Sequence, residues 1–165
     1  MGSDANGRSQ QRHEDWMRQA IELATANVRT GGGPFGAVIT MRDELVATGQ
    51  NQVATSNDPT AHAEVVAIRN ACAQLGSFSL EGCTLYSSCE PCPMCMGAIL
   101  WAHCDALYFG NTAKDADAAG FADAQYYQEI RKSNGKRRLT TKNLLRDEAG
   151  ASFKAWALLS ERIIY

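Results

Sequence analysis

The sequence lacks an excess of charge of either sign, a long hydrophobic run and any internal repeat. Its 165 residues carry a formal net charge of −2, which provides no general attraction to polyanions such as nucleic acid. No apolar run approaches the ~20 residues that a transmembrane helix needs, and the first residues do not form a signal peptide. We therefore expect a cytoplasmic protein with no nucleic-acid partner and no membrane partner.

The hydrophobic content, 45% of the residues, is high enough for one compact core. Residues 1–11 are polar and contain glycine, so we expect a disordered leader or tag there. Residues 12–165 are predicted to form a single domain.

The six cysteines do not have the arrangement of a disulfide framework. Three crowd into one predicted strand-to-helix turn: Cys89, Cys92 and Cys95. The other three lie singly in apolar segments and are predicted to be small core residues: Cys72, Cys83 and Cys104. A reducing compartment, with some thiols bound to metal, accounts for this distribution.

The hydrophobic periodicity predicts an α/β fold. Apolar residues at helical spacing, or runs that end at glycine, predict helices over 13–29, 61–75, 93–102, 123–132 and 147–162. Strands are predicted over 35–41, 45–49, 83–88 and 106–110, with an extended piece over 139–145. The first two strands form an antiparallel hairpin, and the strand, helix and strand over 83–110 form a parallel βαβ unit. We expect a three-layer α/β/α domain with a mixed five-stranded sheet.

Two short motifs carry the chemistry. His62 lies two residues before Glu64, and Cys92 and Cys95 lie about thirty residues further on. One imidazole and two thiolates form three ligands of a tetrahedral zinc, which leaves a fourth position for water. Pro93 suits the first position of a helix whose positive end favours thiolates. The motifs predict one catalytic Zn²⁺ per subunit.

Glu64 is too close to His62 for both to face the same way on an ideal helix. The spacing is therefore consistent with a shared site only in the first helical turn, where a long glutamate can curl back. There it can hold a zinc-bound water and transfer its proton. The pattern H-x-E followed by P-C-x-x-C is the established signature of zinc-dependent deaminases.

Three other interpretations of these residues are open. Cys92 and Cys95 could form a redox disulfide, as a Cys-x-x-Cys pair does in thioredoxin-like proteins. Cys89 could be a fourth zinc ligand, which would make the site structural. The chain could also be a zinc module that binds partners without catalysis.

The sequence resembles the cytidine deaminase superfamily and, within it, the guanine deaminases of bacterial type. The resemblance is densest over 31–39, 55–64, 88–99 and 119–123. The zinc motifs indicate the superfamily, whereas the Ser-Asn-Asp-Pro-Thr run at 56–60 and the Gly-Phe-x-Asp segment at 120–123 narrow it towards guanine.

The resemblance implies a role for each matching residue. The zinc ligands would be His62, Cys92 and Cys95, with Glu64 as the proton shuttle. The residues expected at the purine are Asn51, Phe35, Trp101, Asp123 and Tyr165, where Asp123 reads N–H groups of the base and assists proton transfer. In this family the C-terminal segment, here about 139–165, is exchanged between the subunits of a homodimer, so Tyr165 would close the partner's pocket.

Some of these positions also have ordinary structural interpretations. Phe35 and Trp101 could be core aromatics, Asn51 could brace its loop, and Tyr165 could be a frayed end. The sequence also departs from a frequent Gly-Phe-Asp-Asp pattern, because Ala122 stands where the first aspartate is expected. We expect this change to remove one carboxylate near the pocket.

The reaction expected from the resemblance is the hydrolysis of guanine to xanthine and ammonia. A guanosine deaminase is an alternative, since it shares the Gly-Phe-x-Asp segment and a terminal tyrosine. Other small aminated rings, such as triazines, are possible substrates as well. A tRNA adenosine deaminase shares the zinc motifs but should carry a basic surface that this acidic chain lacks.

Overall fold

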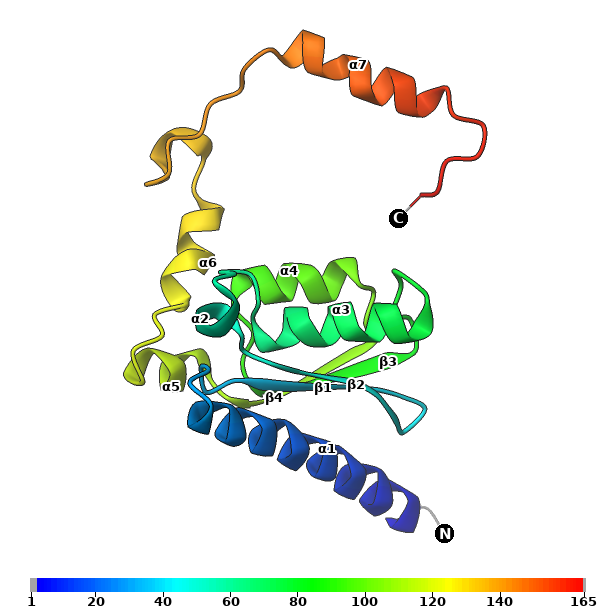
Figure 1. Ribbon diagram of the computed structural model, residues 1–165, viewed down its shortest axis with the longest axis vertical. Helices are drawn as coiled ribbons and strands as arrows, with labels where there is room; N and C mark the ends of the chain where they lie inside the picture. The colour runs from blue at the N-terminus through cyan, green and yellow to red at the C-terminus, as the bar shows by residue number, and fades with distance from the viewer. Residues whose placement is uncertain (1–2, 165) are drawn as a thin grey trace. The chain divides into compact units, whose positions relative to one another are not determined.

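The computed structural model describes residues 3–164, with side chains from residue 9 onward. The chain divides into two compact units, one that ends at Tyr126 and one that begins at Tyr127. The prediction of a single domain over 12–165 therefore corresponds to two units in the structure, and each is described by itself (Figure 1).

The first unit is built on a mixed four-stranded sheet with the order β2-β1-β3-β4. Its strands are β1 (Gly36–Met41), β2 (Glu44–Gln50), β3 (Cys83–Cys89) and β4 (Ala106–Asn111). Strand β1 pairs antiparallel with both β2 and β3, whereas β3 and β4 are parallel. The predicted hairpin and the predicted parallel βαβ unit are thus both confirmed.

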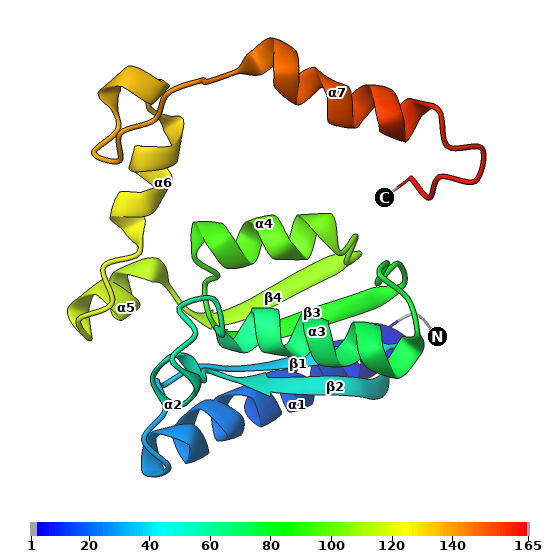
Figure 2. The same ribbon diagram turned by 45° about the horizontal axis from the view of Figure 1, so that its top comes forward.

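Helices cover both faces of this sheet. Helix α1 (Ser3–Arg29) lies against one face, and α3 (Ala63–Leu75) and α4 (Pro93–Trp101) lie against the other, as Figure 2 shows. Two short helices, α2 (Val53–Ser56) and α5 (Ala113–Ala118), follow β2 and β4. This arrangement confirms the three-layer α/β/α architecture.

Side chains of β1 and β3 alternate between two hydrophobic cores, as the period of two requires. The core toward α3 and α4 contains the following buried residues: Ala37, Ile39, Ala63, Ala67, Ala71, Leu80, Cys83, Leu85, Ile99 and Ala102. On the other face, Val38 and Tyr86 pack with Ala20 of α1. This alternation decides which strand residues can reach the site.

Two glycines allow the helices to approach the sheet closely. A Cβ at Gly36 would lie 2.5 Å from the carbonyl oxygen of Ala20, on α1. A Cβ at Gly49 would clash with the carbonyl oxygen of Ala63 and lie 2.5 Å from the nitrogen of Ala67, both on α3. Because these neighbours are backbone atoms, only glycine fits at either position.

The predicted disordered leader over residues 1–11 differs from the structure where the structure describes it, and residues 1–2 lie outside the described residues. Residues 3–11, predicted to be a disordered leader, are the first turns of α1. They extend a helix that is already nucleated by its packing on the sheet, and propagating a helix costs less than starting one.

The five-stranded sheet is not confirmed: the described residues form a sheet of four strands, and the piece over 139–145 has no strand pairing within the chain. Its middle is polar, Thr140 to Asn143, and an extended segment forms a stable strand only where a neighbouring strand pairs with it.

The second unit contains one turn and one longer helix. Helix α6 (Ala124–Arg131) spans the junction, followed by a 3-10 turn, η1 (Asn134–Lys136), and α7 (Arg146–Ala157). Helix α7 ends five residues before the predicted end at 162. The guanidinium of Arg162 donates to the carbonyl oxygens of Ala157 and Leu159, at 3.0 and 3.2 Å, which satisfies acceptors at the helix end.

Among the described residues, none of the helices combines the length and the apolar character needed to cross a bilayer.

Candidate active site

The N-termini of α3 and α4 present the proposed metal ligands. His62 and Cys92 are the N-cap residues of these helices, and both have extended backbones, with ψ of 155° and 168°. Pro93 occupies the first turn of α4, as predicted. The N-cap position of His62 explains its spacing from Glu64, because the chain turns between them and is not yet a regular helix.

The three predicted ligands are brought together. Their donor atoms all lie within 4.8 Å of one another. The Sγ atom of Cys92 is 3.6 Å from Nδ1 of His62 and 3.6 Å from Sγ of Cys95. Two soft sulfurs and one imidazole nitrogen at these separations suit tetrahedral zinc and leave one position open. The donor set therefore fits the metal that the sequence predicts.

Electrostatics at the cluster favour a thiolate. Hydrogen bonds from Cys95 and from His62 lower the pKa of Cys92 to about 4. The hydrogen bond to Cys92 raises the pKa of His62. A thiolate is the form of cysteine that binds metal, so the site favours the reactive form of Cys92 before any ion arrives.

The structure does not support the two other interpretations of these thiols. The sulfurs of Cys92 and Cys95 are free and not bonded to each other. Cys89 is outside the three-residue cluster found among the described residues. Its thiol donates to the carbonyl oxygen of Thr112 at 3.7 Å, and burial raises its pKa to about 11. Cys89 is thus a buried neutral thiol rather than a fourth ligand.

Glu64 lies in the first turn of α3, with 6% of its surface exposed. Its Oε1 accepts a hydrogen bond from the hydroxyl of Ser87, on β3, at 3.3 Å. Burial raises the pKa of the Glu64 carboxyl. A raised pKa makes the carboxylate a stronger base, which helps it to accept a proton from water and to release that proton later.

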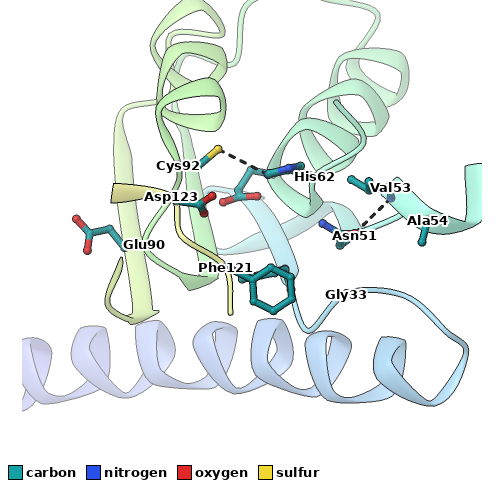
Figure 3. Close-up of a pocket in the computed structure, with 11 residues that line it drawn as sticks. Gly33, Asn51, Val53, Ala54, His62, Glu90, Cys92, Phe121 and Asp123 are labelled. Atoms are coloured by element: carbon teal, nitrogen blue, oxygen red, sulfur yellow. Dashed lines mark hydrogen bonds between the residues drawn. The ribbon is translucent and has the colours of Figure 1, made fainter. Parts of the chain in front are cut away.

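A cavity of about 280 Å³ opens beside this cluster. Its lining residues are Gly33, Phe35, Asn51, Val53, Ala54, His62, Glu64, Glu90, Cys92, Phe121 and Asp123 (Figure 3). Phe35 and Phe121 pack edge to face, with ring centroids 4.9 Å apart. The cavity thus combines apolar walls with a few polar groups, as is typical of a site for a small planar ligand.

Asn51 is held in the cavity wall by its neighbours. It is 7% exposed, and its Oδ1 accepts a hydrogen bond from the backbone N–H of Val53 at 3.3 Å. The side-chain amide of Asn27, on α1, donates to the carbonyl oxygens of both Gly33 and Asn51 at 2.8 Å. These bonds hold the two loops that line one side of the cavity.

Asp123 approaches the cavity from the segment after α5. Helix α5 begins with a capping box between Thr112 and Asp115, and the carboxylate of Glu90 accepts the N–H of Ala113 at 2.8 Å. These contacts hold the start of the helix that leads to Asp123. Burial raises the pKa of the Asp123 carboxyl, and the negative charge of Cys92 acts in the same direction.

Two predicted features lie away from the cavity, and a third falls on a residue that the structure does not describe. Trp101 is the last residue of α4, at the opposite end from Cys92; it is 69% exposed and does not line the cavity. Its prediction as a pocket residue is not supported, because a nine-residue helix separates its two ends by about 12 Å. Ala122 is exposed and outside the lining, so the expected loss of a carboxylate does not occur inside the cavity. Tyr165 lies outside the described residues.

Sequence reasoning missed five of the lining residues: Gly33, Val53, Ala54, Glu90 and Phe121. The motifs contain three of them, since Gly33 belongs to the 31–39 run, Glu90 precedes Pro91 and Phe121 belongs to the Gly-Phe-x-Asp segment. Their side chains alone gave no reason to place them at the cavity. The residues of α2 gave no signal, because a four-residue helix leaves no periodicity.

Comparison with known families decides the assignment of this site. The model of the cytidine and deoxycytidylate deaminase zinc-binding region matches residues 10–111, which is more than half of the chain. The chain belongs to this zinc-binding deaminase family. It is therefore an enzyme of the deaminase class, and the fold and the His-Cys-Cys cluster are those of a zinc-binding domain.

Individual relatives narrow the comparison. The chain is 49% identical to a guanine deaminase of Bacillus subtilis over 145 residues, which cover 87% of this chain and 93% of the relative. A crystal structure of guanine deaminase from Bacillus subtilis matches with a TM-score of 0.90 and 47% identity, covering 93% of this chain and 98% of that one. A tRNA-specific adenosine deaminase of Bacillus subtilis is 40% identical over 97 residues, 59% of this chain and 60% of the relative.

Proposed function

We propose that this protein hydrolyses guanine to xanthine and ammonia. The observation that carries the proposal is one cavity that is lined by His62 and Cys92 of the metal cluster, by the buried carboxyl of Glu64, and by the carboxyl of Asp123. The 49% identity to a guanine deaminase, over nearly its whole length, supports the choice of substrate.

In this proposal His62, Cys92 and Cys95 hold one zinc ion. When bound there, zinc supplies the Lewis acidity that makes a water molecule nucleophilic near neutral pH. The N-termini of α3 and α4 both point their positive ends at this position. Oxidation of either thiol would remove a ligand, so we also propose that the protein works in a reducing compartment such as the cytoplasm.

The remaining cavity residues would recognise the base. Guanine presents two neighbouring donors, N1–H and the 2-amino group, which a carboxylate such as Asp123 can accept together. Phe35 would pack against the ring together with Phe121, and the amide of Asn51 would hydrogen-bond to a ring edge. Adenine and cytosine lack this donor pair, so the same carboxylate would select against them.

Glu64 would carry the protons. It accepts one from the attacking water as the oxygen bonds to C2, and it delivers that proton to ring N3. The second proton of the water passes through Glu64, with help from Asp123, to the amino group. The C2–N bond then breaks and ammonia leaves, so that guanine and water are converted to xanthine and ammonia in balance.

Ammonia release from a panel of bases tests the substrate. We expect the purified, zinc-loaded protein to release ammonia from guanine and far less from guanosine, adenine, cytosine, cytidine and a tRNA anticodon stem. A glutamine in place of Glu64 should keep the zinc content and abolish turnover, whereas a module that only binds partners would be unaffected. Faster release of ammonia from guanosine, or from adenosine in tRNA, would show that guanine is not the preferred substrate.

We further propose a homodimer in which residues 139–165 are exchanged between subunits. The support is the exposure of the large apolar residues in this segment, including Phe153 at 78%, Leu158 at 86% and Ile164 at 73%. So many exposed apolar side chains call for a covering surface. In such a dimer the extended piece over 139–145 could add the fifth strand to a partner's sheet, and Tyr165 could close the partner's cavity.

The oligomeric state tests this second proposal. Light scattering during gel filtration should give twice the mass of one chain. A variant truncated after residue 138 should be monomeric and should still bind zinc, because the metal cluster lies entirely in the first unit. A full-length monomer that turns over guanine would refute the exchange.

A further inference from the structure

Strand β3 carries two adjacent serines, both buried, that face opposite sides of the sheet. Ser87 is 2% exposed and Ser88 is 3% exposed. Ser87 continues the face of Cys83 and Leu85, which packs toward α3 and α4. The hydroxyl of Ser88 faces the other way and accepts the backbone N–H of Gly36 at 3.1 Å. The two serines thus have the same chemistry and burial but different partners.

The partner of Ser87 is Glu64. Its hydroxyl donates to Oε1 of the carboxylate at 3.3 Å, and this bond joins the sheet to the first turn of α3 across 23 residues of sequence. Ser87 does not line the cavity, so it does not touch a ligand there. Its side-chain hydrogen bond reaches the site through Glu64.

A carboxylate on a long side chain needs such a contact. Glutamate has three rotatable side-chain bonds, so the hydrogen bonds that its carboxyl accepts from its own backbone N–H and from the Cys95 thiol leave room for a further contact that fixes its direction. A hydrogen bond to one oxygen from a strand, which is more rigid than a loop, fixes the plane in which the other oxygen lies. Proton transfer depends steeply on that direction.

We propose that Ser87 is a positioning residue for the proton shuttle: its hydroxyl fixes the Glu64 carboxylate for proton transfer. The inference rests on the proposed function in one respect, namely that Glu64 transfers protons in turnover. It assigns to Ser87 no contact with substrate or metal. Loss of the hydroxyl therefore lowers kcat and leaves KM for guanine and the zinc content unchanged.

The expected loss of kcat can be estimated from the strength of a hydrogen bond to a charged carboxylate. Loss of a single hydrogen bond to a carboxylate is expected to lower kcat about tenfold to a hundredfold. The decisive comparison is between Ser87→Thr and Ser87→Val, which add the same volume to a buried site and differ only in the hydroxyl. We expect the threonine variant to keep the kcat of the wild type, and the valine variant to lose as much as Ser87→Ala.

Ser88→Ala is the matched control, because it removes the same group from the neighbouring buried position. It should leave kcat and KM at wild-type values. If Ser87→Thr and Ser87→Val have equal kcat, or if both serine-to-alanine variants lose activity equally, the hydroxyl of Ser87 does not position Glu64 and the inference is overturned.

A second readout does not depend on turnover. High-resolution crystal structures of the metal-free protein should show one conformer of Glu64 in the wild type and in Ser87→Thr, and a rotated or multiple carboxylate in Ser87→Ala. An unchanged single conformer in Ser87→Ala would overturn the inference. If the wild type deaminates another aminated ring instead of guanine, the proposed substrate fails while the same kcat comparison is made on that ring.

Discussion

A methyl group at position 49 should disturb both the fold and the site. Gly49 lies on β2, where its Cα faces the backbone of α3 at Ala63 and Ala67. A Cβ would lie 2.5 Å from the Ala67 nitrogen, whereas ordinary contacts begin near 3.4 Å, so α3 would have to retreat by about 1 Å. Backbone cannot rotate away as a side chain can. We expect Gly49→Ala to lower the free energy of unfolding by about 1–3 kcal/mol.

The same displacement of α3 should also affect catalysis, because α3 begins immediately after His62 and carries Glu64 in its first turn. A displacement of about 1 Å at a reacting group can cost up to about a hundredfold in rate. We therefore expect Gly49→Ala to lower kcat/KM for guanine by about ten- to a hundredfold even where the protein remains folded.

The matched control is Gly97→Ala, within α4, where an added Cβ meets no atom within 4 Å. Alanine is the better helix former, so this variant should be as stable as the wild type or more stable by up to about 1 kcal/mol. Urea unfolding followed by circular dichroism, with zinc at a fixed concentration, measures both. If Gly49→Ala is as stable as Gly97→Ala, the close approach of β2 and α3 is not as the structure has it.

Three further predictions concern the pocket, the metal and pH. Gly33→Ala should raise KM for guanine about tenfold at unchanged zinc content, since its Cβ would lie 3.0 Å from Oδ1 of Asn51 and displace the amide; an unchanged KM would count against the role of Asn51. Removal of zinc with a chelator should lower the thermal midpoint by about 5–10 °C, because the ion binds only the folded cluster, and added zinc should restore it; equal midpoints with and without zinc would contradict a folded site. Hydrogen bonds from the Thr60 hydroxyl and backbone lower the pKa of Asp58, so its folded-state pKa is below the unfolded one. The stability advantage of the wild type over Asp58→Asn should be complete near pH 6 and should disappear as the pH falls through about 4 and below. Urea titrations at several pH values measure this advantage, and one that grows on acidification would contradict a lowered pKa of Asp58.

Periodicity and spacing predicted most of the first unit. The alternation over residues 35–49 predicted an antiparallel hairpin, and the apolar run over 83–88 predicted a strand with a parallel partner. Both pairings are present in the structure. The motifs also predicted that His62 and Cys92 lie at the N-termini of helices. Local sequence marks such a position, as Pro93 does at the start of α4.

Periodicity and spacing could not predict features that depend on contacts between residues far apart in the sequence. The segment 139–145 has the composition of a short strand but no partner strand, and pairing is not encoded in the segment itself. Trp101 follows the metal motif closely in sequence, yet the straight axis of α4 carries it away from the cavity. The hydrogen bond from Ser87 to Glu64 joins residues 23 apart and depends on which face of β3 meets α3.

The proposed chemistry depends on a zinc ion held by one nitrogen and two sulfurs, and X-ray absorption at the zinc edge measures this coordination. For the purified protein we expect one zinc per chain with two sulfur neighbours at ~2.3 Å and two lighter neighbours, nitrogen and oxygen, at ~2.0–2.1 Å. A spectrum with three or four sulfurs, or a protein that takes up no zinc with its thiols reduced, would contradict this coordination.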